Sequence, residues 1–240
     1  MLDEQISNAW KAGTKCEKCA IRNMVLFADL TREDFDLMHR PIHDFELRAG
    51  ETLYNVEADP THIFTLRSGL IKLISYLPDG SHRIVRIIKQ GDVVGLEAMG
   101  GKPYLHHAVV LEVATLCKIP VSLIDTLNEN SPHLSKQLML RWQQVISDAD
   151  IWLSQLSVGL ANQRVASLLL YLAEGDNKDK CYLPSREDMG ATLAISPETA
   201  SRVVASFKRE GWVKSTSPYR VSLNPGALAG LLENKKDLIL

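Results

Sequence analysis

The sequence has 240 residues, a formal net charge of −2 and a hydrophobic content of 45%. This length suits two ordinary domains, and the near-neutral charge excludes a protein that coats nucleic acid through its overall charge. No apolar run approaches the roughly 18 residues that span a membrane, and the first residues lack the layout of a signal peptide. We therefore expect a cytoplasmic protein with reduced cysteines.

Short β-type runs alternate with glycines from about Pro41 to Pro120, which is typical of a small barrel or roll. Within this region Leu70–Tyr76 and Arg83–Ile88 flank Pro78-Asp79-Gly80, a strong hairpin signal. The pattern predicts an antiparallel β-roll.

A long helix is expected after the roll. Its apolar residues alternate at spacings of four and three, which forms an a/d seam. The seam consists of Leu138, Trp142, Val145, Ala149, Trp152 and Leu156. A second stripe at spacing seven consists of Met139, Ile146 and Leu153. One stripe can pack on the roll while the other meets a second copy of the chain, so the pattern predicts a dimerisation helix; an internal helix is the alternative.

Two short helices joined by a tight turn are predicted between Leu183 and Val213. The second helix would start after Ser196, a favourable N-cap, with Pro197 at its first position. Its buried stripe recurs at i, i+3, i+4 and i+7 and consists of Ala200, Val203, Val204 and Phe207. This is the pattern of a helix-turn-helix, and a β-wing and a final short helix would follow it.

The buried stripe leaves Glu198, Ser201 and Arg202 facing away from the core. Arginine can donate two hydrogen bonds to guanine, glutamate can accept one from cytosine, and serine can do either. Three such residues at the start of a helix predict base reading in the major groove, and a solvated helix face is the alternative. The residues expected to contact DNA phosphates are Lys208, Arg209 and Lys214.

The segment Glu198-Thr199-Ala200-Ser201-Arg202 resembles the E-T-x-S-R motif of the CRP/FNR family of bacterial transcription regulators, in its FNR-like branch. Arg67-Ser68-Gly69, Gly91-Asp92-Val93-Val94-Gly95 and the order of elements fit the same family over essentially the whole chain. The resemblance implies an α+β fold whose roll is similar to the jelly roll of cyclic-nucleotide-binding domains. The implied divisions are an N-terminal arm (1–24), a β-roll sensor domain (25–125), a dimerisation helix (131–158) and a winged helix-turn-helix domain (160–240).

The resemblance also implies a homodimer that regulates transcription from a TTGAT-N4-ATCAA-like palindrome; whether it activates or represses stays open. Glu198, Ser201 and Arg202 would read the half-site. Pro197 occupies the preceding base-contact position, where proline is not usual, so the outer base is unassigned. The loops where the family contacts RNA polymerase correspond to Pro78–His82 and Gly175–Lys180.

Cysteines offer one route for a signal. FNR-like regulators hold a four-iron cluster with four thiolates, and Cys16, Cys19 and Cys117 match three of these positions, while Val25 stands at the fourth. A cluster here would need a ligand from outside the set, for which Asp29 and Cys181 are the candidates. Cys181 is otherwise expected to be a loop thiol without function. A disulfide switch or another metal at the same thiols is the alternative.

A cyclic nucleotide is not expected in the roll. The family's nucleotide binders have a Gly-Glu pair and then an arginine that pairs with the phosphate. Here Gly95 is followed by Leu96 and only then by Glu97, and Tyr104–His107 contains no arginine. Two other classes of protein are alternatives. One is a metal-binding, cupin-like enzyme, which the histidine spacing does not suit. The other is a sensor module for a protein partner, which would not need the exposed polar residues of the second helix.

Overall fold

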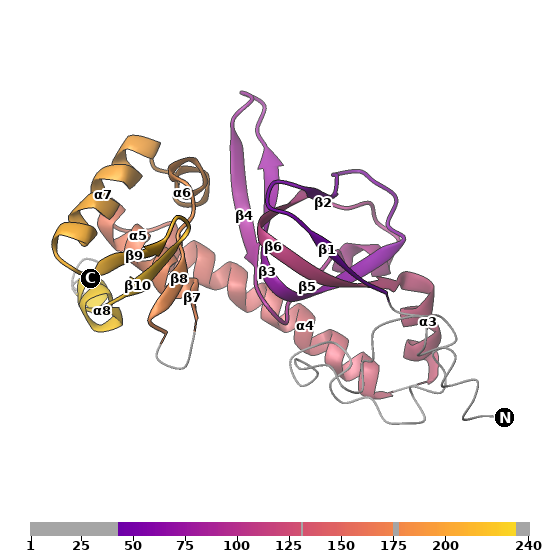
Figure 1. Ribbon diagram of the computed structural model, residues 1–240. Coiled ribbons are helices and arrows are strands. Elements are labelled where there is room, and N and C mark those ends of the chain that lie inside the picture. The colour runs from indigo at the N-terminus through magenta and orange to yellow at the C-terminus, as the bar shows by residue number, and fades with distance from the viewer. Residues whose placement is uncertain (1–42, 131, 175–177, 234–240) are drawn as a thin grey trace. The chain divides into compact units, whose positions relative to one another are not determined.

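The computed structural model describes residues 43–130, 132–174 and 178–233 (Figure 1). The expected N-terminal arm, with Cys16 and Cys19, lies outside these residues. Two compact units are present: the first extends to Tyr76 and resumes over Val85–Ile146, and the second combines Leu77–Ile84 with the chain from Ser147 onward. Among the described residues, no helix is both long enough and apolar enough to cross a membrane.

The first unit is built on an antiparallel sheet of six strands, coloured indigo to magenta in Figure 1. The strands are β1 (His43–Leu47), β2 (Thr52–Tyr54), β3 (His62–Tyr76), β4 (His82–Ile88), β5 (Val93–Val94) and β6 (His107–Pro120). Their order is β1-β6-β3-β4, with β2 paired to β6 and β5 paired to β3. The predicted hairpin is confirmed, because the turn between β3 and β4 is closed by a 2.8 Å hydrogen bond from the Leu77 N–H to the Ser81 carbonyl.

At Gly69, in the segment Arg67-Ser68-Gly69, the backbone of β3 lies close to that of β6. Gly69 has a φ of +88°, and a Cβ at this position would lie 2.2 Å from the Val113 carbonyl oxygen. The pairing register shifts on both sides of this glycine. A glycine is therefore required here, since a side chain would collide with the backbone of the neighbouring strand.

Two helices follow the roll: α3 (Val121–Asn130) and α4 (Pro132–Ile151), which continues into a π-helical turn, η4 (Trp152–Leu156). The sequence did not indicate α3 as a separate element, although its residues Leu123, Ile124 and Leu127 are buried in the core of the roll. Proline at the first position of α4 explains the break, because it suits a helix start but disfavours continuation of the preceding helix. Together α4 and η4 fall within the residues 131–158 expected for the long helix.

The second unit combines four α-helices with a four-stranded sheet. Its helices are α5 (Ala161–Tyr171), α6 (Arg186–Leu193), α7 (Pro197–Arg209) and α8 (Pro225–Glu233). Its strands are β7 (Ala173–Glu174), β8 (Lys180–Tyr182), β9 (Val213–Ser217) and β10 (Arg220–Leu223), in the order β7-β8-β10-β9. The wing, β9 and β10, was predicted, whereas β7 and β8 lie where the sequence indicated only a polar loop. Strands of two and three residues are too short to show an alternating pattern.

Candidate nucleic-acid interface

The start of α7 is fixed by the residues that the sequence indicated. The Ser196 hydroxyl accepts a 3.2 Å hydrogen bond from the Thr199 N–H, and Pro197 occupies the first turn. Ala200, Val204 and Phe207 are buried, so one side of α7 packs into the second unit. This anchoring orients the opposite side of the helix toward solvent.

The four predicted base-reading residues, Pro197, Glu198, Ser201 and Arg202, are all exposed on the first turns of α7. Hydrogen bonds from the Glu198 backbone N–H and from the Ser196 hydroxyl lower the pKa of the Glu198 carboxyl, and the charge of Arg202 lowers it further. Glu198 is therefore an ionised acceptor at neutral pH. Arg202 donates from one guanidinium nitrogen to the Thr199 hydroxyl at 3.4 Å, which leaves other N–H groups for an external acceptor.

The turn between α6 and α7 is held by a residue that the sequence did not single out. Arg164, on α5, donates a 2.7 Å hydrogen bond to the carbonyl of Leu193, the last residue of α6. Ala194 then adopts a left-handed conformation with a φ of 54°. A cation at the carbonyl end of α6 stabilises the helix terminus. The only signal in the sequence is that Arg164 is the single charged residue of α5.

Replacing Gly190 by alanine should loosen this turn. The Cβ would lie 2.8 Å from the Ile195 carbonyl oxygen, which belongs to the backbone and cannot rotate away. We expect the free energy of unfolding in urea to fall by about 1–3 kcal/mol. Gly230→Ala is the matched control, because nothing lies within 4 Å of a Cβ at that position of α8, and alanine should be neutral or stabilising there. Equal effects of the two substitutions would contradict the steric explanation.

The three predicted phosphate-contacting residues occupy the end of α7 and the wing. Arg209 and Lys214 are exposed, as expected. Lys208 is exposed as well, and its Nζ donates a 2.8 Å hydrogen bond to the Ser215 hydroxyl on β9. Lys208 thus also links α7 to the wing, while its remaining N–H groups are available to a phosphate.

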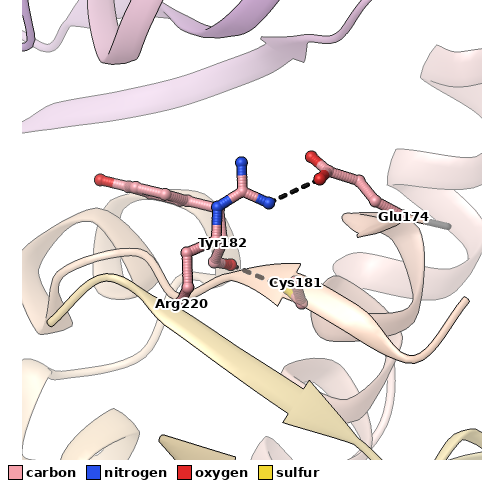
Figure 2. Close-up of polar contacts among 4 residues, drawn as sticks. All are labelled: Glu174, Cys181, Tyr182 and Arg220. Carbon is pink, nitrogen blue, oxygen red and sulfur yellow. Dashed lines mark hydrogen bonds and ion pairs between the residues drawn. The ribbon is translucent and has the colours of Figure 1, made fainter. Parts of the chain in front are cut away.

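Side chains of β7 and β8 contact the wing and stabilise it (Figure 2). Arg220 on β10 forms an ion pair of 2.5 Å with the Glu174 carboxylate on β7. The ring of Tyr182 stacks with that of Tyr219 at the wing tip, with centroids 6.4 Å apart. These contacts explain why the two short strands matter: they make the wing the edge of a sheet instead of an isolated hairpin.

The exposure of the side chains along α4 and η4 shows that the predicted dimer seam does not follow a single solvent-facing side of the helix. Of its six residues, Leu138, Trp152 and Leu156 are buried within their own chain, Val145 is partly buried, and only Trp142 and Ala149 are exposed. A different stripe, which we call the exposed stripe, also follows a 3-4 spacing and faces solvent. It consists of Met139, Trp142, Ile146, Ala149 and Leu153. The original seam therefore mixed two faces, since Leu138 packs on the roll core and Trp152 packs against Tyr171.

Residues 44–130 match the family described as cyclic nucleotide-binding domain, and residues 163–231 match the Crp-like helix-turn-helix domain. A relative from Pseudomonas aeruginosa, Transcriptional activator protein anr, is 31% identical over 208 residues, which cover 83% of this chain and 85% of the relative. The chain belongs to the CRP/FNR family of transcription regulators. The family and the fold class expected from the sequence are thus confirmed, and the relatives that place it there are regulators, not enzymes.

Other comparisons agree with this placement in the CRP/FNR family. The Fumarate and nitrate reduction regulatory protein of Escherichia coli K12 is 27% identical over 93% of this chain and 92% of its own length. Among solved structures, FixK2 from Bradyrhizobium japonicum has a TM-score of 0.70 at 22% identity and covers 79% of this chain and 96% of its own. This structural likeness supports the fold.

Cys117 does not complete a metal site within the described part of this CRP/FNR regulator. It lies on β6 opposite Thr65 and Asp44 and is buried. Across residues 43–130, 132–174 and 178–233, no group of three or more histidine, cysteine or acidic side chains could hold a metal ion. The other two predicted thiolates, Cys16 and Cys19, fall outside these residues, and Val25 cannot ligate iron. The three cysteines that match the family's cluster positions therefore fall one short of the usual four.

Cys181 is not the loop thiol that the sequence suggested. It lies on β8, is fully buried, and its Sγ donates to the Tyr182 carbonyl at 2.8 Å (Figure 2). Burial and the nearby Glu174 carboxylate raise the pKa of this thiol from 9.0 to about 12. It is therefore a neutral core residue at physiological pH and a poor metal ligand.

The thiol of Cys181 should resist alkylation while the protein is folded. The rise in pKa from 9.0 to about 12 lowers the thiolate fraction at pH 8 by roughly a thousandfold, and the thiolate is the reactive form. We expect iodoacetamide labelling of Cys181, followed by peptide mass spectrometry, to be at least ~100-fold slower in native buffer than in 8 M urea, used as the unfolded control. Comparable rates in both solvents would show that β8 opens readily.

Proposed function

We propose that this regulator binds, as a dimer, an inverted repeat related to TTGAT-N4-ATCAA. The observation that supports this most directly is the exposure of Glu198, Ser201 and Arg202 together on the first turns of α7, whose opposite side is buried. These side chains carry the donors and acceptors that distinguish base pairs in the major groove. Arg209, Lys214 and the free N–H groups of Lys208 would bind phosphates and make the affinity salt-dependent.

The exposed stripe of α4 supports the dimer. Its residues follow a heptad spacing, as in a two-stranded coiled coil, and in the single chain Met139 is 73% and Leu153 is 67% exposed. Pairing of two copies along this stripe would relate the two recognition helices by two-fold symmetry. Helices about 34 Å apart would then enter successive major grooves on one side of the DNA.

Equilibrium binding to duplex DNA tests the site preference. A duplex with TTGAT-N4-ATCAA should bind at least ~10³-fold more tightly than a duplex of scrambled sequence at the same salt concentration. A duplex whose two half-sites are separated by five additional base pairs serves as the geometric control, because it moves the second half-site to the opposite side of the helix. Equal affinity for all three duplexes would contradict the proposal.

The signal is proposed to enter through the roll or the N-terminal arm and to change the population of the DNA-binding form. An iron–sulfur cluster at Cys16, Cys19 and Cys117 is one candidate, because relatives of the chain are fumarate and nitrate reduction regulators. Anaerobic purification with iron and sulfide analysis tests it: near-stoichiometric iron and sulfide that are lost in Cys16→Ala would support a cluster. A metal-free protein that binds the palindrome would exclude it and leave a thiol switch or a small ligand.

Contact with RNA polymerase is proposed through the turn between β3 and β4. Pro78, Asp79, Gly80 and Ser81 are exposed, and Asp79 is held in place by hydrogen bonds from the Ser81 N–H and hydroxyl at 2.9 and 2.6 Å. A defined, charged turn is a suitable docking surface. The gene activation stated in the name of the relative from Pseudomonas aeruginosa is the output that we propose here as well.

A further inference from the structure

Thr199, between the two charged base-reading residues of α7, contacts both the helix cap and one of those residues. It lies in the first turn of α7 and is partly buried, whereas Glu198 and Arg202 are exposed. Its hydroxyl accepts a 3.2 Å hydrogen bond from the Ser196 hydroxyl and a 3.4 Å hydrogen bond from one guanidinium nitrogen of Arg202. Thr199 therefore connects the exposed arginine to the residue that caps the helix.

The position of Thr199 is fixed by the cap and by the core of the second unit. Its backbone N–H donates a 3.2 Å hydrogen bond to the Ser196 hydroxyl, and the next residue, Ala200, is fully buried. A threonine in a helix has few χ1 rotamers, because its Cβ carries two heavy atoms. The Thr199 hydroxyl oxygen is thus held in a defined position, from which it can fix a more flexible side chain.

Arg202 has a long side chain that loses rotamer freedom when it is fixed against the edge of a base. Residues three positions apart are neighbours on the surface of a helix, so the contact between Thr199 and Arg202 follows from the helical geometry. Restricting a side chain before binding lowers the entropy cost of binding. A guanidinium has five N–H groups, so a bond to Thr199 still leaves two donors for a guanine.

We propose that Thr199 is a positioning residue that orders Arg202 for the guanine of the half-site and thereby determines part of the sequence preference. The inference rests on the proposed function, because the guanine contact of Arg202 belongs to it. A phosphate contact from the Thr199 hydroxyl is the competing role, since threonine side chains also bind the DNA backbone. The two roles differ in their sequence dependence. Ordering of Arg202 matters only where the guanine is present, whereas every base pair has phosphates.

Binding of the full chain to two duplexes separates these roles. The first duplex contains TTGAT-N4-ATCAA, and the second contains TTAAT-N4-ATTAA, which lacks the guanine. Thr199→Val should weaken binding to the first duplex roughly 2- to 10-fold per half-site and leave binding to the second unchanged. Thr199→Ser keeps the hydroxyl and should bind the first duplex as the wild type does. Equal losses on both duplexes would show a phosphate contact, and no loss on either would show no role; both results overturn the proposal.

A measurement without DNA keeps this inference separate from the proposed function. NMR relaxation of the Arg202 Nε–H group reports how strongly the guanidinium is ordered on the ps–ns timescale. Its order parameter should fall in Thr199→Val and keep the wild-type value in Thr199→Ser. An unchanged order parameter in Thr199→Val would overturn the proposal even if the palindrome is bound. If the wild type fails to prefer the palindrome, the proposed function is wrong, and the relaxation measurement still decides whether Thr199 orders Arg202.

Discussion

Arg202→Ala should abolish most of the sequence preference of DNA binding. Arg202 is exposed on α7, and a two-hydrogen-bond contact from arginine to guanine contributes about 1–3 kcal/mol of discrimination at each half-site. Loss of that contact corresponds to roughly a 5- to 150-fold increase in Kd per half-site. We expect this loss on the palindrome but little change on scrambled DNA, measured by fluorescence anisotropy at fixed salt.

Lys214→Ala is the matched control for Arg202→Ala. Lys214 is also exposed and cationic, but it lies on β9 and not on the recognition helix. Its loss should weaken binding to all sequences about equally and reduce the salt dependence by about one phosphate contact. If Arg202→Ala behaves in the same uniform way, Arg202 contacts a phosphate, and the assignment of base reading is wrong.

Ile146→Asp should convert the dimer to a monomer. Ile146 lies in the middle of the exposed stripe and is 61% exposed in the single chain. An aspartate there removes apolar contact and places two like charges close to the two-fold axis, where they repel each other. Sedimentation velocity at micromolar concentration should show a dimer for the wild type and a monomer for the variant. The affinity for the palindrome should also fall, because each monomer can bind only one half-site.

Two further variants separate the exposed stripe from the rest of α4. Ser147→Asp adds the same charge at an exposed position next to Ile146 but on a different face of the helix, so it should remain dimeric. Leu138→Ala removes a side chain that packs on the roll core. It should lower the free energy of unfolding by about 2–5 kcal/mol without a specific loss of dimer. A dimeric Ile146→Asp protein would contradict the exposed stripe as the interface.

The predicted dimer seam combined residues from two faces of the helix, and this has a physical cause. Leu138, Val145 and Trp152 repeat every seven residues, and Met139, Ile146 and Leu153 do the same one position later. Periodicity alone cannot say which of two such stripes faces the molecule's own core, because both satisfy the same spacing. The structure distinguishes them by burial. By contrast, α7 was predictable because its cap, its first-turn proline and its apolar stripe are all local signals that agree.

The remaining omissions all depend on tertiary contacts. Arg164 reaches Leu193 across 29 positions of the sequence, so no local pattern reveals that it caps α6. The strands β7 and β8 are identified only by their pairing with each other and with β10.

Cys181 also has a consequence for how oxidants could act on this regulator. A buried, protonated thiol reacts slowly with peroxide or disulfides, because the thiolate is the nucleophile that attacks them. The cysteine of the helix-turn-helix domain is thus in its unreactive, protonated form. Oxidants should therefore leave the thiol of this domain unmodified. Any oxidant response of the intact protein should accordingly persist in Cys181→Ser and map to cysteines in the first half of the chain.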